Sequence, residues 1–137
     1  MMANVLTSVI LLVATAFFAW HEQGQPWTPL RLAGALVALV GVVLVLIARA
    51  QLGKSFSVTA QARELVTTGL YSRIRNPIYY AGFLVISGLA MYLRKPALLG
   101  FAVLLIPLQI RRARKEAAVL REAFGERYDR YRAGTWF

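Results

Sequence analysis

Four runs of apolar residues, separated by short polar segments, dominate the chain. The first two, residues 3–20 and 30–50, are each long enough as helices to cross a hydrocarbon core of about 30 Å at about 1.5 Å per residue. The third and fourth, residues 78–93 and 96–110, are shorter and are separated by a basic pair that can reach the headgroups. The pattern predicts an all-α integral membrane protein, a single domain over residues 1–137, with about four transmembrane helices.

Three of these runs have a second interpretation. The first could belong to a signal peptide, because Ala14-Thr15-Ala16 resembles a cleavage site. No Lys or Arg precedes the run and its apolar stretch is long, so a retained span is favoured. The two short runs could be re-entrant segments that enter and leave the membrane on one side.

Residues 111–132 are predicted to form a cytoplasmic amphipathic helix. Its apolar stripe recurs at helical spacing at Leu120, Phe124, Tyr128 and Tyr131. Counting back by fours places Glu116 and Arg112 on the same face, where a carboxylate needs a partner because burying an unpaired charge is costly. That partner is either Arg112 itself, in a plain ion pair, or a polar ligand. Gly125 is unfavourable inside a helix and predicts a break or bend.

The basic residues predict which side of the membrane each segment faces. Thirteen of the 16 Lys and Arg residues fall on one side if all four runs cross, at Arg49, Lys54, Arg63, Arg73, Arg75, Arg111, Arg112, Arg114, Lys115, Arg121, Arg127, Arg130 and Arg132. The other three are Arg31, Arg94 and Lys95. Because basic residues collect in cytoplasmic loops, the loop after the second run and both termini are predicted to be cytoplasmic.

Composition supports a membrane protein and narrows the chemistry. Hydrophobic residues make up 58% of the chain, above the roughly 45–50% of soluble domains. The net charge of +10 lies between the apolar runs, so it does not indicate nucleic acid as a partner. The chain has no cysteine and a single histidine, His21, which argues against a disulfide or a thiolate or histidine metal site. No glycine-rich phosphate loop is present in the sequence.

One face of the second run carries small residues. Gly34, Ala38 and Gly41 follow one another at helical spacing and would let another helix approach closely. This face is most simply a packing surface within the chain. Together with the short third and fourth runs, it also permits a homodimer.

The polar segment before the third run combines structural and chemical features. Asn76 suits a helix N-cap, Pro77 suits the first helical turn, and Tyr79 and Tyr80 suit the membrane interface. Arg75 stands beside this helix start, whose dipole already favours anions. The segment is therefore a candidate carboxylate or phosphate site.

Two motifs frame the third and fourth runs, LVTTGLYSRIRNPIYY from residue 65 and EAAVLREAFGERYDRY from residue 116. In order and spacing they resemble the isoprenylcysteine carboxyl methyltransferase and phospholipid methyltransferase superfamily of membrane enzymes. The superfamily pattern is roughly L-V-x-x-G-x-Y-x-x-x-R-H-P-x-Y, then two spans, then E-E-x-x-L-x-x-x-F-G-x-x-Y-x-x-Y. About 35 residues match closely.

The resemblance implies methyl transfer from S-adenosylmethionine to a lipid-like or hydrophobic small-molecule acceptor at the cytoplasmic membrane face, with a carboxylate of the isoprenylcysteine kind as one candidate. By position, the implied cofactor-binding residues are Glu64, Leu65, Val66, Tyr71, Asn76, Pro77, Ile78, Tyr79 and Glu116. Arg112 matches an arginine associated with the acceptor. Arg112 and Arg75 are the candidate catalytic residues, each able to hold a carboxylate.

Two departures from the superfamily pattern keep an alternative open. Asn76 stands where histidine is usual, and Asn cannot act as a base near neutral pH. Ala117 replaces a second glutamate, which weakens the expectation of an amine acceptor. The alternative is a non-catalytic membrane relative in which Arg112 and Glu116 only pair. A transporter is disfavoured, because no charged residue lies deep inside an apolar run.

Overall fold

The computed structural model describes residues 13, 16–17, 20–21, 24–53 and 65–136. In this part of the chain all regular elements are helical and no strand is present, which confirms the all-α prediction there. The elements are α2 (Pro29–Leu52), the short 3-10 helix η2 (Gly69–Ser72), α3 (Pro77–Leu93), α4 (Ala97–Phe124) and α5 (Glu126–Ala133). Most of the first apolar run lies outside the described residues.

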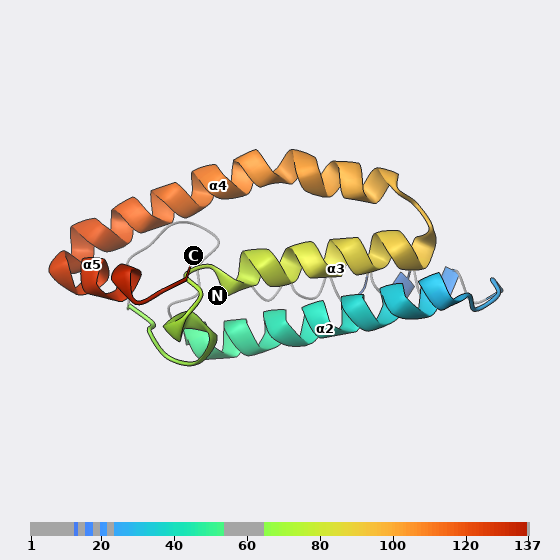
Figure 1. Ribbon diagram of the computed structural model, residues 1–137, viewed down its shortest axis with the longest axis horizontal. Coiled ribbons are helices and arrows are strands. Elements are labelled where there is room, and N and C mark those ends of the chain that lie inside the picture. Colours follow the sequence, from blue (N-terminus) through green and yellow to red (C-terminus); the bar gives the residue numbers. More distant parts are fainter. Residues whose placement is uncertain (1–12, 14–15, 18–19, 22–23, 54–64, 137) are drawn as a thin grey trace.

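Helices α2 and α3 lie antiparallel and side by side (Figure 1). Their backbones touch where glycines face each other: a Cβ added to Gly34 would overlap the backbone of Gly88, and one on Gly41 would lie 2.7 Å from the Val85 nitrogen. Gly88 in turn faces the backbone of Ala38. The small face of the second run therefore packs against α3 within the same chain, as expected of small residues at helix contacts.

Helix α3 begins where the sequence predicts, but its first turn is not capped by the predicted side chain. Asn76 occupies the N-cap and Pro77 the first helical turn, as predicted. The Asn76 side chain makes no capping hydrogen bond, however. The Asn76 carbonyl instead accepts a bond from the Tyr79 nitrogen at 3.1 Å. The amide side chain of Asn76 is thus not committed to the helix end.

The prediction of a separate helix over residues 111–132 is wrong at its beginning. Helix α4 runs without interruption from the fourth apolar run into the basic segment that follows it. Apolar and charged side chains can both favour a helix, so the change in polarity does not end it. Pro107 lies inside α4, which arches away from α3 (Figure 1). The predicted break at Gly125 is confirmed: its φ of 51° ends α4, and α5 turns back toward the start of α3.

The helices present apolar side chains outward. Leu36 and Leu39 of α2 and Leu104 and Leu108 of α4 are all exposed, as lipid-facing residues would be. Among the described residues, α2 is the one helix long and apolar enough to cross a membrane, while α3 is apolar but shorter. The structure therefore contains one candidate span, and the four-span arrangement stays a prediction.

Arg31 links the start of α2 to the end of α3. Its guanidinium lies 4.5 Å from the ring centre of Tyr92 and 5.0 Å from that of Trp27, and Nη2 donates to the Tyr92 hydroxyl at 2.8 Å. Nη1 donates to the Gln25 carbonyl at 2.9 Å. Arg31 is only 2% exposed, so its side chain stabilises the packing of α2 on α3 and is not a solvent-exposed charge of a loop.

We expect Gly88→Ala to destabilise the protein. The new methyl group would collide with the backbone of Ala38, and overpacking of this kind costs about 1–3 kcal/mol. Gly82→Ala is the matched control in the same helix, since nothing lies within 4 Å of its Cβ and Ala favours a helix by about 0.5–1 kcal/mol. Thermal unfolding in detergent, followed by circular dichroism, should give a lower Tm for the first variant only. Equal Tm values would contradict close packing of α2 on α3.

Candidate functional site

The segment before α3 forms a tight turn that is held by α2. The Leu70 nitrogen donates to Gln51 Oε1 at 2.8 Å, so the last turn of α2 fixes η2. Gly69 has a φ of 61°, and a Cβ there would overlap the Gln51 amide. Leu65, which precedes this turn, and Tyr71, which lies within it, are both buried. These two motif residues are therefore buried at a turn that is held against α2.

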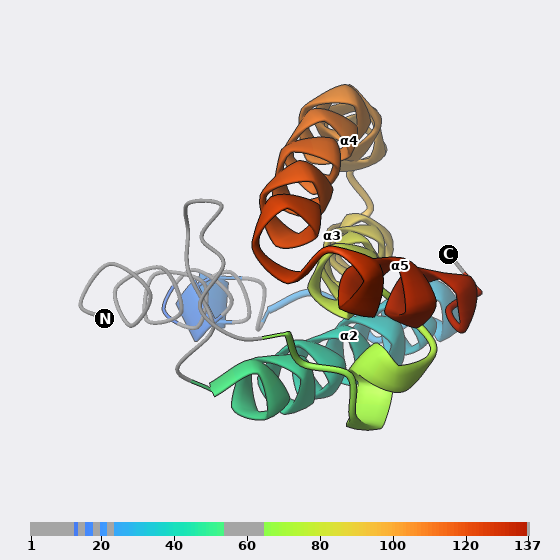
Figure 2. The ribbon, with the colours of Figure 1, turned by 90° about the vertical axis from the view of Figure 1, so that its left-hand side faces the viewer.

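The C-terminal segment binds the same turn from the other side. The Tyr131 hydroxyl donates to the Tyr71 carbonyl at 2.7 Å, and the Trp136 nitrogen donates to the Arg73 carbonyl at 2.8 Å. The Arg73 guanidinium also lies 5.8 Å from the Trp136 ring centre. Viewed from this end of the molecule, α5 lies in front of α3 and next to η2 (Figure 2). Hydrogen bonds between segments 60 residues apart in sequence thus hold the C-terminal segment at one end of the α2–α3 pair.

Glu116 joins α4 to α3 at the same end. Its Oε1 accepts a hydrogen bond from the Tyr79 hydroxyl at 2.7 Å and another from Arg112 Nε at 3.1 Å. The Arg112 guanidinium lies 5.9 Å from the Tyr79 ring centre. The Glu116 side chain is 26% exposed, so the carboxylate is shielded but reachable. No described residue donates to its second oxygen, Oε2, which can accept a bond from a ligand.

The tyrosines around the turn keep their protons. Burial raises the pKa of Tyr131 to about 12, with a neighbouring contribution from Tyr128 and opposition from Arg75. Burial also raises the pKa of Tyr71, and electrostatic interactions with Tyr131 and with the Glu116 carboxylate raise it further. Both phenols are therefore neutral at physiological pH, which Tyr131 requires in order to donate to the Tyr71 carbonyl.

The structure brings some of the predicted site residues together and leaves others apart. Arg112, Glu116 and Tyr79 are in direct contact, and Tyr71 is near enough for the Glu116 charge to act on its pKa. Arg75 is half-buried, and its positive charge opposes the rise in the pKa of Tyr131. In the part of the chain that the structure describes, it makes no ion pair with Glu116. Its Nε is buried and has no hydrogen-bond partner in the described part of the chain.

The remaining predicted residues flank this cluster. Pro77 is buried, and Val66, Asn76 and Ile78 are half-buried around the start of α3. Glu64 lies outside the described residues. The buried Leu65, like Pro77, supports the turn.

Two residues that hold the turn were missed from the sequence. Gln51 ends an apolar helix, and a polar side chain just before Gly53 was the only signal that it might turn back onto another segment. Tyr131 was assigned to an apolar stripe, but its hydroxyl makes a specific bond to Tyr71. Both contacts join residues far apart in sequence, which helical spacing does not reveal.

An apolar cavity of about 230 Å³ lies beside the turn, on the side of α3 nearer to α2. It is lined by Leu44, Leu70, Ile74, Pro77, Tyr80, Ala81 and Leu84. Such a lining suits a hydrocarbon group and offers little to a charged one. The turn thus contributes Leu70 to an apolar cavity, while its Tyr71 is near enough to Glu116 for that charge to act on the Tyr71 pKa.

The model of the phospholipid methyltransferase family matches residues 30–127, which is more than half of the chain. The matched region contains nearly all of α2, the whole of α3 and α4, the whole first motif and the second motif as far as Arg127. The chain therefore belongs to the phospholipid methyltransferase family, as the resemblance of its motifs predicted. Members of this family are membrane methyltransferases that act on lipid-like substrates and generally use S-adenosylmethionine. No curated protein and no solved structure gave a match.

We expect Gly69→Ala to loosen the turn, because a side chain there meets both a positive φ and the Gln51 amide. Gly125→Ala is the matched control: its φ is also positive, at 51°, but nothing lies within 4 Å of its Cβ. Both variants carry backbone strain of about 1–2 kcal/mol, and the first should lose more stability in thermal unfolding. In a Gln51→Ala background, which has already lost the bond from the Leu70 nitrogen, Gly69→Ala should cost only the backbone strain. Equal Tm values for the two single variants would contradict the contact between Gln51 and η2.

Proposed function

We propose that the protein transfers a methyl group from S-adenosylmethionine to the polar end of a lipid-like acceptor at the cytoplasmic face of the membrane. The observation that carries this proposal is the contact of Glu116 with Tyr79 and Arg112, which joins both motifs beside the start of α3. Membership of a methyltransferase family supports the reaction type.

The residues around this contact fit the three chemical groups of S-adenosylmethionine. Glu116 Oε2 can accept a hydrogen bond from a hydroxyl or ammonium group. Arg75, whose Nε is buried without a partner among the described residues, suits a carboxylate. The rings of Tyr71 and Tyr79 are suited to a sulfonium cation. Asn76, with an uncommitted amide, can add a further hydrogen bond.

When bound, S-adenosylmethionine supplies an electrophilic methyl group that a nucleophile takes in an in-line displacement. The protein then contributes mainly by positioning the reacting atoms about 3–3.5 Å apart and by keeping water out. The bonds from Tyr131 and Trp136 to the turn close the site on its outer side. No side chain of this cluster has to act as a covalent nucleophile.

The cluster suits an acceptor that is already anionic. Asn76 cannot take a proton near neutral pH, and Oε1 of Glu116 already accepts two hydrogen bonds. An amine acceptor would have to lose a proton, whereas a carboxylate would not. Arg112, whose side chain is 40% exposed, is placed to hold such a carboxylate. The apolar cavity beside η2 provides surface for the hydrophobic part of an acceptor.

A non-catalytic relative is the second candidate function. The ion pair between Arg112 and Glu116, at 3.1 Å, is the observation in its favour, since a structural pair needs no ligand. An exposed pair of this kind contributes only about 0.3–0.5 kcal/mol. In that case removing both charges should cost little stability, and the wild-type protein should not bind the cofactor.

The wild-type protein should bind S-adenosylmethionine in isothermal titration in detergent. Glu116→Gln should weaken binding by about 10- to 100-fold, because a hydrogen bond to a charged group contributes about 1.5–3 kcal/mol. Glu122→Gln is the matched control, since Glu122 is an exposed acid farther along the same helix. Binding heat that is absent in the wild type, or equally reduced by both substitutions, would contradict the proposed site and favour the second candidate.

A further inference from the structure

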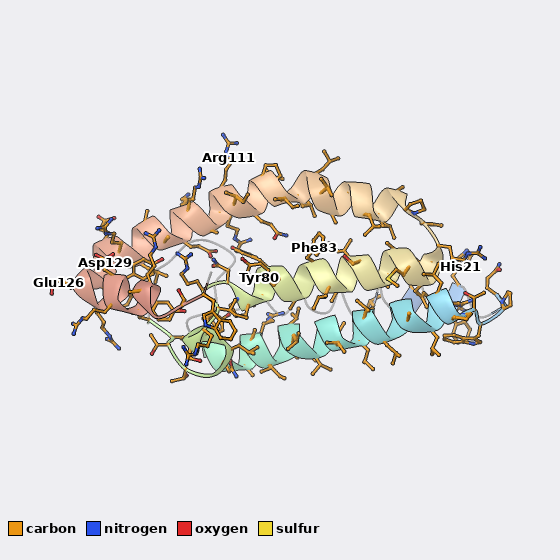
Figure 3. The ribbon with its side chains drawn as sticks, in the orientation of Figure 1. His21, Tyr80, Phe83, Arg111, Glu126 and Asp129 are labelled. Atoms are coloured by element: carbon orange, nitrogen blue, oxygen red, sulfur yellow. The ribbon has the colours of Figure 1, made fainter. Side chains whose placement is uncertain are left out.

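The outer face of α4 changes from apolar to basic within one helical turn. Leu104 is 73% exposed and Leu108 58% exposed, and both carry hydrocarbon side chains to the surface. Arg111 and Lys115 continue this stripe at helical spacing, and Arg114 lies next to it; all three are exposed. Figure 3 shows Arg111 pointing away from α3. An exposed apolar stripe thus ends directly in a cluster of positive charge.

Nothing in the described part of the chain neutralises this cluster. Arg112, between its members, turns instead to Glu116. Arg111, Arg114 and Lys115 have no acidic residue three or four positions away on the helix, and none of the three makes an ion pair with a described residue. Like charges at this spacing repel one another, so the cluster favours an external anion.

We infer that Arg111, Arg114 and Lys115, here called the basic collar, bind the headgroups of anionic phospholipids. A helical turn rises about 5.4 Å, so the collar lies at the level where headgroups begin if Leu108 contacts lipid chains. Basic residues at this level are attracted to an anionic membrane surface. A protein or nucleic acid would have to displace lipid to reach the collar, which makes lipid the favoured partner.

The collar also sets the depth of the candidate site. Glu116 follows Lys115 directly on the same helix, so headgroups bound at the collar would hold the Glu116 carboxylate at the membrane surface. This consequence rests on the proposed function, whereas the lipid binding itself does not. Loss of cofactor binding with intact lipid preference would therefore count against the proposed function alone.

The test uses the full chain purified in detergent with equal amounts of phosphatidylglycerol and phosphatidylcholine, and measures the retained lipids by native mass spectrometry. The wild type should retain phosphatidylglycerol preferentially, by about fivefold for each contributing charge. Arg111→Gln, Arg114→Gln and Lys115→Gln combined should abolish the preference. The matched control combines Arg127→Gln, Arg130→Gln and Arg132→Gln, three exposed residues of α5. It removes the same charge away from the apolar half of α4 and should keep the preference.

Three results of this comparison would overturn the inference. These are a wild type without lipid preference, a collar variant that retains phosphatidylglycerol like the wild type, and equal losses in the collar and α5 variants. Displacement of phosphatidylglycerol by inorganic phosphate would also do so, because it would indicate a site for free anions. If the triple collar variant does not fold, Arg111→Gln alone should show a partial loss of about fivefold.

Discussion

The hydrogen bond from Tyr79 to Glu116 is the contact on which the arrangement of the polar end depends. Helices α2 and α3 are held together along their length by touching backbones, but α4 arches away from them. Glu116 brings α4 back to the start of α3, where Arg112 shares the same carboxylate oxygen. A charged acceptor bound by two donors in a shielded position is stronger than a neutral pair, which allows one side chain to fix this position.

The turn that faces Glu116 is held by elements distant in sequence. Gln51, at the end of α2, binds η2 on one side, and Tyr131, in α5, binds it on the other. The site is therefore complete only when α2, α3, α4 and α5 are all folded. A site assembled in this way suits a reaction that depends on positioning, since each binding residue is held by a rigid neighbour.

The sequence predicted features that depend on local patterns. Apolar runs located α2 and α3, and the conformational preference of Gly125 located the break after α4. The sequence failed to predict that α4 continues from the fourth apolar run into the basic segment, because this change in polarity brings no change in backbone conformation. The burial of Arg31 between Trp27 and Tyr92 was also missed, since this contact forms only when α2 and α3 pack.

The candidate site shows the same division between local and distant information. Helical spacing placed Glu116 on the inner face, and the resemblance to a family paired its motif with that of Tyr79. Arg112 was a candidate partner from the sequence, whereas the Tyr79 donor and the orphaned Nε of Arg75 became visible only in three dimensions. The most direct measurement is to irradiate membranes holding the wild-type protein with S-adenosylmethionine radiolabelled in its methyl group, and to map the label by peptide. Label on peptides containing Tyr71, Tyr79 or Glu116, removed by excess unlabelled cofactor, is expected; label that resists this competition or falls on other peptides would contradict a cofactor site at Glu116.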